Sequence, residues 1–134
     1  MTTIAWDGKK LVGDTQTQCG NLRDLTPVLK ITEMDDHYIA VCGNLFVVQK
    51  YINGTMTRKD LKESQLLRVF KTGTAEVTDG TGHWFAVEAP FAMGTGGEVA
   101  LGALLAGASA TKAVEIAIKV DTSSGGPLQV IKVL

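Results

Sequence analysis

The chain has little of what marks a secreted, metal-binding or nucleic-acid-binding protein. Cysteine occurs only twice in 134 residues, at Cys19 and Cys42, without the spacing of a metal site. Isolated cysteines of this kind are typical of buried thiols in a reducing compartment, so we expect no disulfide, no metal and a cytoplasmic location. The formal net charge is -1 and no basic block is present, which argues against a nucleic-acid partner.

Long apolar runs are also missing. The longest, from Val99 to Ala110, is rich in glycine and alanine and is too short to cross a bilayer, so a buried helix is expected and no membrane contact. The first residues lack an apolar core of signal-peptide length. His37 and His83 stand in no ligand or catalytic motif, and we expect surface or structural roles and no cofactor.

What is present is an ordinary globular composition, with 45% hydrophobic and 20% charged residues. The length suits one domain, residues 1–134, with a real core. Strands are expected over 3–6, 10–14, 28–34, 38–41, 66–70, 83–87 and 127–134, and helices over 44–52, 98–106 and 110–120. The charged segment 57–64 fits either a short helix or a solvated loop. Runs of strands that alternate with runs of helices predict an α+β layered sandwich.

Thr2 is the first residue with candidate chemistry. Removal of Met1 would leave a threonine that carries both a hydroxyl and a free α-amine. With a pKa of about 7.7–8.0, that amine can take the proton of the hydroxyl and make it a nucleophile. Asp14, Lys30 and the turn 121–126 could complete a site, although each alone also fits a structural role. Lys30 in particular fits an outward-facing charge on a strand.

The order of these features resembles the proteasome β-type subunits and their bacterial relatives, the HslV-type peptidases, which are N-terminal-nucleophile threonine hydrolases. Residues 2–5 look like the mature N-terminus of that family, and Gly13-Asp14 stands at its Gly-Asp or Ala-Asp pair. Lys30 falls in the register of the family's active-site lysine. Residues 94–97 resemble its Gly-Ser-Gly-Gly turn, and residues 121–126 match its Asp-x-x-Ser-Gly-Gly turn. Five motifs in the right order are more specific than any one of them.

The resemblance implies a four-layer α/β/β/α sandwich, a homo-oligomeric ring, a peptide or unfolded protein as substrate, and an ATP-driven unfoldase as a further partner. The chain looks shorter than family members, mainly between residues 43 and 94 and in the helix before residue 121. Because the central helices of the family take part in subunit and unfoldase contacts, ring size and partner docking stay open.

The resemblance also implies roles for the site residues. Thr2 would attack a peptide carbonyl and form an ester, and Lys30 would lower the cost of its alkoxide. Asp14 would keep Lys30 charged, since a carboxylate favours the ammonium form. The backbone N–H of Gly43 would hold the oxyanion, with Asn44 as the alternative because the alignment needs a gap there.

Three further residues are expected around the terminal amine. Asp121 and Ser124 would hydrogen-bond the threonine terminus and fix the amine. Thr95 stands in the place of a family serine that contacts the amine, so it keeps the hydroxyl and adds a methyl group.

Substrate-binding residues follow from the same register. Thr17 and Gln18 would offer backbone groups to an extended peptide. A pocket for an apolar side chain would be lined by Val28, Thr32, Val41 and Leu45. Two other functions stay open, namely a catalytically silent subunit with an assembly or scaffolding role, and an amidase of the N-terminal-nucleophile class that acts on small substrates.

Overall fold

The computed structural model describes residues 2–19 and 22–134, and the fate of Met1 lies outside them. Its first sheet is antiparallel, has four strands and runs in the order β10-β1-β2-β11. The strands are β1 (Thr3–Trp6), β2 (Lys10–Gly13), β10 (Phe91–Gly94) and β11 (Gln129–Lys132). The strands predicted over 3–6 and 10–14 are confirmed as β1 and β2, which pair as a hairpin with Gly8 at a φ of 95° in its turn. Asp7 closes that turn by accepting the N–H groups of Lys9 and Lys10.

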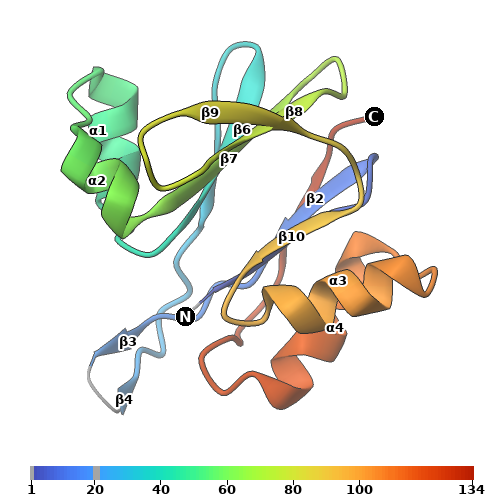
Figure 1. Ribbon diagram of the computed structural model, residues 1–134. Helices are drawn as coiled ribbons and strands as arrows, with labels where there is room; N and C mark the ends of the chain where they lie inside the picture. The colour runs from blue at the N-terminus through green and yellow to red at the C-terminus, as the bar shows by residue number, and fades with distance from the viewer. Residues whose placement is uncertain (1, 20–21) are drawn as a thin grey trace.

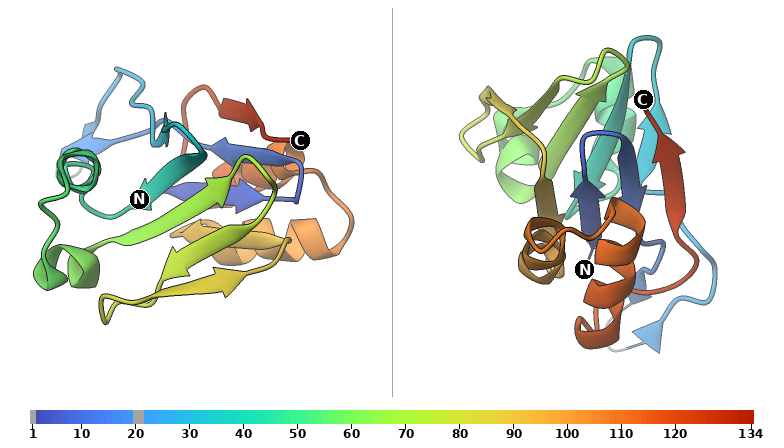
Figure 2. Two further views of the ribbon diagram at one scale, coloured as in Figure 1. Left: turned by 90° about the horizontal axis from the view of Figure 1, so that it is seen from above. Right: turned by 90° about the vertical axis from the view of Figure 1, so that its right-hand side faces the viewer.

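The second sheet has five antiparallel strands in sequence order. They are β5 (Ile31–Glu33), β6 (His37–Cys42), β7 (Gln65–Phe70), β8 (Ala75–Thr78) and β9 (Trp84–Val87). The strand expected over 28–34 is shorter than predicted, because the ladder begins only at Ile31. A separate small hairpin of β3 (Gln18–Cys19) and β4 (Leu22–Arg23) projects from one end of the molecule (Figure 2).

The helices fall into two pairs (Figure 1). One pair is α1 (Val47–Asn53) and α2 (Arg58–Glu63), and the other is α3 (Gly97–Leu105) and α4 (Ala110–Val120). The structure resolves the alternative for residues 57–64 in favour of a helix, since Thr57 and Asp60 form a capping box at the start of α2. Helix α1 begins three residues later than predicted and ends at Gly54, which is left-handed at a φ of 69°. None of the described helices is long and apolar enough to span a bilayer.

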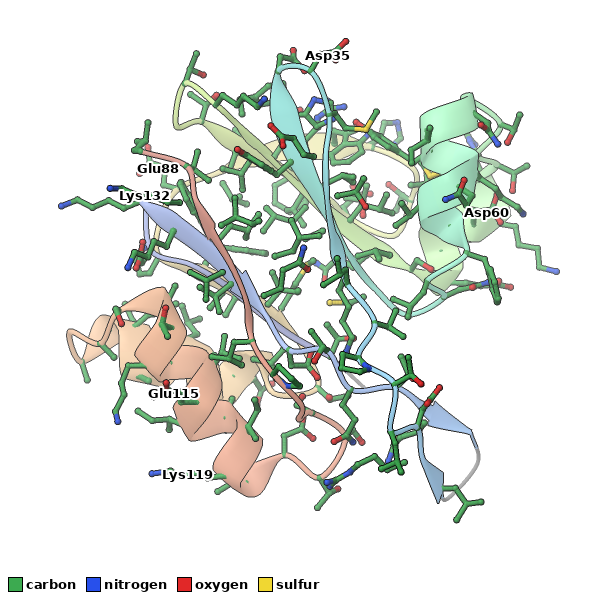
Figure 3. All side chains as sticks on the ribbon, turned by 180° about the vertical axis from the view of Figure 1, so that it is seen from behind. Asp35, Asp60, Glu88, Glu115, Lys119 and Lys132 are labelled. Atoms are coloured by element: carbon green, nitrogen blue, oxygen red, sulfur yellow. The ribbon has the colours of Figure 1, made fainter. Side chains whose placement is uncertain are left out.

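Three apolar clusters hold these elements together. The first lies between the two sheets and includes Ile4, Leu11 and Leu67. The second joins Val12 of the first sheet to α3 and α4, and the third joins the second sheet to α1 and α2 around Val47. Alternation of side chains along each strand lets one sheet serve two clusters, one on each face. The fold is therefore of the mixed α/β kind, with one apolar cluster between the two sheets and a further cluster between each sheet and one helix pair. The charged residues of α4 lie on its outer side, where Lys119 points away from the protein (Figure 3).

Candidate active site

A buried ion pair lies beneath the N-terminal strand. The Lys30 ammonium donates to Asp14 Oδ1 at 2.9 Å, and the two side chains are only 1% and 0% exposed. The Thr3 N–H donates to the same oxygen, also at 2.9 Å. The Lys30 Nζ atom and the Thr3 nitrogen therefore lie no further apart than twice that distance, which brings the lysine close to the start of the chain.

Asp14 also accepts a backbone hydrogen bond from the turn after α4. Its second oxygen, Oδ2, accepts the N–H of Gly125 at 3.1 Å and the N–H of Gln16 at 3.4 Å. A carboxylate that receives an ammonium and several N–H groups is well compensated for the loss of water. The end of β2, the start of β1 and the 121–126 turn are thus fixed around one side chain.

Gln129 of β11 positions the backbone of Lys30, a role that the sequence did not reveal. Its carboxamide oxygen accepts the N–H groups of Lys30 and Ile31 at 3.1 and 3.0 Å, and its amide nitrogen donates to the Ile31 carbonyl at 2.8 Å. These bonds tie the edge of the second sheet to the first sheet. Because Ile31 faces the core between the sheets, its neighbour Lys30 points the other way along the strand, toward Asp14.

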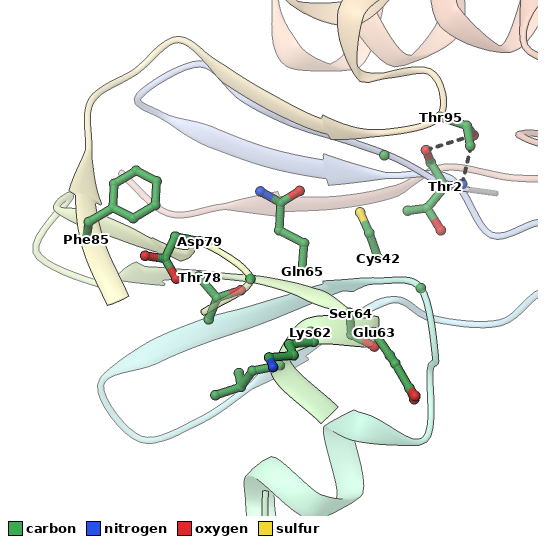
Figure 4. Close-up of a pocket in the computed structure, with 14 residues that line it drawn as sticks. Thr2, Cys42, Lys62, Glu63, Ser64, Gln65, Thr78, Asp79, Phe85 and Thr95 are labelled. Atoms are coloured by element: carbon green, nitrogen blue, oxygen red, sulfur yellow. Dashed lines mark hydrogen bonds between the residues drawn. The ribbon is translucent and has the colours of Figure 1, made fainter. Parts of the chain in front are cut away.

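A second set of polar groups surrounds Asp121 at the surface. Asp121 Oδ2 accepts the hydroxyls of Thr95 and Ser124, each at 2.6 Å. The Thr2 N–H in turn donates to Thr95 Oγ1 at 3.2 Å (Figure 4). Burial alone would raise the pKa of Asp121, but the hydroxyls of Ser124 and Thr95 and the N–H of Ser123 outweigh it and hold the pKa below its ordinary value. Asp121 is therefore an ionised acceptor at neutral pH, joined to the Thr2 nitrogen through Thr95.

Thr3 extends this hydroxyl network and was also missed from the sequence. Its Oγ1 lies 2.7 Å from Ser124 Oγ, and the residue is wholly buried. Since Ser124 donates its proton to Asp121, Thr3 donates to Ser124. The neighbouring Gly96 must be glycine, because a Cβ there would lie 2.0 Å from Thr3 Oγ1. A buried hydroxyl in an otherwise apolar strand is the one sequence signal that could have pointed to Thr3.

A cavity of about 800 Å³ opens beside Thr2 (Figure 4). Thr95 and Gly94 line it next to Thr2, and Gly43 and Cys42 line it from the end of β6. Gly43 has a φ of 99°, and a Cβ there would come within 2.7 Å of the Glu63 carbonyl oxygen, so only glycine fits. Burial raises the pKa of the Cys42 thiol to about 12, which leaves it neutral and unreactive beside the threonine.

The residues predicted from register to bind substrate lie elsewhere. None of Val28, Thr32, Val41 and Leu45 lines the cavity beside Thr2. Val41 is wholly buried in the cluster under α1, so the structure corrects its placement on a pocket surface. The backbones of Thr17 and Gln18 are engaged by the small hairpin, where the Thr17 carbonyl accepts the Asp24 N–H at 2.9 Å and Gln18 pairs with Arg23.

The described residues contain no group of three His, Cys, Asp or Glu side chains that could hold a metal ion. The polar chemistry of the site is instead that of hydroxyls, one buried ion pair and one ionised carboxylate. Such groups can position a nucleophile and stabilise its charge.

No protein-family model matches the chain, and no curated protein matches it in sequence. Solved structures do match over nearly the whole length. The chain is similar to BPH of Thiobacillus denitrificans in complex with epoxomicin, with a TM-score of 0.74, 17% identity, and coverage of 99% of this chain and 98% of that one. A second structure of BPH from Thiobacillus denitrificans matches with a TM-score of 0.71 and 19% identity, and the match covers 99% of this chain and 98% of that one.

The chain is also similar to eukaryotic HslV from Trypanosoma brucei, with a TM-score of 0.74, 21% identity and coverage of 98% of each chain. At such identities the likeness concerns the fold, and it agrees with the resemblance that the motifs suggested. The chain has the proteasome/HslV-like fold.

Proposed function

We propose that this protein is a threonine-type endopeptidase that uses Thr2 as its nucleophile once Met1 has been removed. The proposal rests on two hydrogen-bond networks, one that binds the backbone of Thr2 and one that binds the backbone of Thr3. Asp14, paired with Lys30, accepts the Thr3 N–H. Thr95 accepts the Thr2 N–H and donates its own hydroxyl to Asp121, which also accepts the hydroxyl of Ser124. A scaffold without chemistry at this terminus has no need for a buried ammonium and an ionised carboxylate there.

The mechanism assigns each network a task. Thr2 Oγ1 attacks the substrate carbonyl and passes its proton to the α-amine, which Thr95 and Asp121 orient. The Lys30 ammonium favours the threonine alkoxide by its charge, and Asp14 holds that ammonium in place. The N–H of Gly43, which lines the same cavity as Thr2, stabilises the oxyanion of the tetrahedral intermediate. The intermediate collapses to an ester of Thr2 as the peptide C–N bond breaks, and the protonated α-amine gives its proton to the leaving amine. Water then attacks the ester, passes a proton to the α-amine, and releases the carboxylic acid half and the free Thr2 hydroxyl.

The fold of the solved neighbours supports further parts of the proposal. We propose the four-layer arrangement of the N-terminal-nucleophile hydrolases, a homo-oligomeric ring that encloses the sites, unfolded protein as substrate and an ATP-driven unfoldase that feeds it in the cytoplasm. The second candidate is a catalytically silent subunit with a scaffolding role. It draws on the same fold, but it leaves the buried ion pair and the hydroxyl network without a use.

Hydrolysis of an unfolded polypeptide tests the proposal. The preparation would be checked by intact mass for loss of Met1 and by sedimentation for its oligomeric state. We expect cleavage by the trimmed chain and none by a Thr2→Ala variant or by a chain that keeps an extra N-terminal residue. A trimmed, folded and assembled chain without cleavage activity would favour the silent subunit.

A further inference from the structure

The two faces of β6 lead to different places beside Thr2. Val41 and Cys42 are neighbours on this strand, so their side chains point to opposite faces of the second sheet. Val41 packs in the cluster under α1, whereas Cys42 belongs to the cluster between the sheets. Cys42 lines the cavity beside Thr2, and Val41 does not. The substrate pocket predicted from the sequence included Val41 and Leu45, which lie on the opposite face of the second sheet, in the cluster under α1. Thr2 thus stands next to a cavity that the register did not predict.

Most of the wall of this cavity is uncharged. Lys62 and Glu63 contribute to its lining, but Figure 4 shows their side chains directed away from it. The Asp79 carboxylate also lines the cavity and is ionised, because the hydroxyl and N–H of Thr81 hold its pKa below the ordinary value. It is fixed in its own turn, where Oδ1 accepts that N–H and that hydroxyl at 2.8 and 2.6 Å. At the far end the ring of Phe85 is 47% exposed and offers an apolar surface. The neutral thiol of Cys42 completes an apolar wall close to Thr2.

One uncharged hydrogen-bonding side chain points into this cavity. The Gln65 side chain, at the start of β7, projects toward the strand that carries Thr2 (Figure 4). Among the hydrogen bonds between residues that the structure describes, none uses its carboxamide. Nearby, the hydroxyls of Ser64 and Thr78 each accept one backbone N–H, from Asn44 and Leu66, and each keeps a proton to donate. The carboxamide of Gln65 therefore offers the cavity one donor and one acceptor group for a polar ligand.

We propose that this cavity is the subsite for the leaving-group side of the substrate, where the uncharged residues that follow the scissile bond bind and Gln65 hydrogen-bonds one of their amide groups. The inference rests on the proposed peptidase function. A volume of about 800 Å³ lies in the range of pockets that bury a ligand the size of a short peptide segment. A carboxamide matches a peptide unit or an amide side chain, since both present one donor and one acceptor group. A carboxylate side chain would lose its water there without gaining a counter-ion, and a lysine would have to draw Asp79 out of its turn with Thr81, so both are disfavoured.

Charge variants of Gln65 test the subsite. The substrates are internally quenched peptides with one common acyl half and either glutamine, lysine or glutamate in the first two positions after the scissile bond. The trimmed wild-type chain should prefer glutamine. Gln65→Glu should shift kcat/KM toward lysine over glutamate by about tenfold, and Gln65→Lys should shift it the opposite way by a similar factor. The matched control is Gln49→Glu, which makes the same charge change on the exposed side of α1 and should leave the preference unchanged.

Two outcomes separate failure of the subsite from failure of the peptidase. A peptide epoxyketone occupies only the acyl side, so its adduct on Thr2 reports the nucleophile independently of the cavity. An adduct in every Gln65 variant, together with an unchanged lysine-to-glutamate preference, would overturn the subsite and leave the peptidase intact. Absence of the adduct in the trimmed wild-type chain would overturn the proposed function itself. Thermal unfolding of each variant, followed by circular dichroism, confirms that the comparison is made between folded proteins.

Discussion

Two carboxylates hold the N-terminal threonines, and they differ in almost every respect. Asp14 is wholly buried, is paired with a lysine that is equally buried, and binds the N–H groups of three separate segments. Asp121 lies near the surface and accepts two hydroxyls and the N–H of Ser123. Asp14 therefore supports the fold through its charge, because removal of either residue breaks a buried ion pair. Asp121 orients groups whose loss the fold can tolerate.

The difference predicts how substitutions at Asp14 and at Asp121 will divide between loss of stability and loss of activity. A buried ion pair costs much when one partner is lost, whereas hydrogen bonds near the surface contribute about 1 kcal/mol each. Loss of stability should thus concentrate at Asp14 and Lys30. Loss of activity without loss of the fold should concentrate at Asp121, Thr95, Ser124 and Thr3.

The same substitution at the two carboxylates should produce the largest contrast. Asp14→Asn keeps an acceptor but removes the negative charge that pairs with the buried Lys30 ammonium, so we expect the free energy of unfolding to fall by about 3–5 kcal/mol. Asp121→Asn should lower it by about 1 kcal/mol and reduce kcat/KM by about a hundredfold, since the amine loses its anionic support. Urea unfolding and peptide hydrolysis measure the two effects. Equal stability losses at both positions would break the distinction.

Thr3→Val should give an intermediate effect. Valine keeps the shape of threonine but removes the hydroxyl that donates to Ser124. We expect a stability loss of about 1 kcal/mol and a fall in kcat of about tenfold with little change in KM, because the substrate does not contact Thr3. Thr3→Ser restores the hydroxyl and should recover most of kcat. If valine and serine behaved alike, the hydroxyl would have no positioning role.

The pH dependence of stability should show the smallest effect. Hydrogen bonds from Ser124 and Thr95 outweigh burial and hold the pKa of Asp121 below its ordinary value near 3.8. Its contribution to stability is therefore fully present above that value and is lost as the pH falls through the folded pKa. The difference in unfolding free energy between wild type and Asp121→Asn should shrink from about pH 5 downward. A difference that grows on acidification would contradict the lowered pKa.

The sequence predicted the fold class and most of the elements, because strand alternation and helical periodicity are local patterns. It missed β8 and β10, since Ala75–Thr78 and Phe91–Gly94 are only four residues long and each includes residues of low strand propensity, alanine with glutamate in β8 and alanine with glycine in β10. It grouped Asp14 with Lys30, and Thr95 with Asp121 and Ser124, by motif order, and the structure joins each group by hydrogen bonds. Their catalytic roles stay predictions.

The residues that the sequence could not supply depend on tertiary contacts. Gln129 acts on Lys30 across two sheets, from 99 residues away in the chain. Thr3 meets Ser124 only because the 121–126 turn folds back under β1. Gln65 points into the cavity because β7 pairs with β6, where Cys42 lies opposite it. No local spacing carries these relations, so only the folded chain reveals them.

The most direct test of the central claim is the intact mass of the protein after reaction with a peptide epoxyketone. On a chain that has lost Met1, the account predicts a single adduct per chain that is absent from Thr2→Ala and preserved in Gln49→Glu. A fully trimmed and folded chain that gains no mass, or an adduct that persists in Thr2→Ala, would contradict the assignment of Thr2 as the nucleophile.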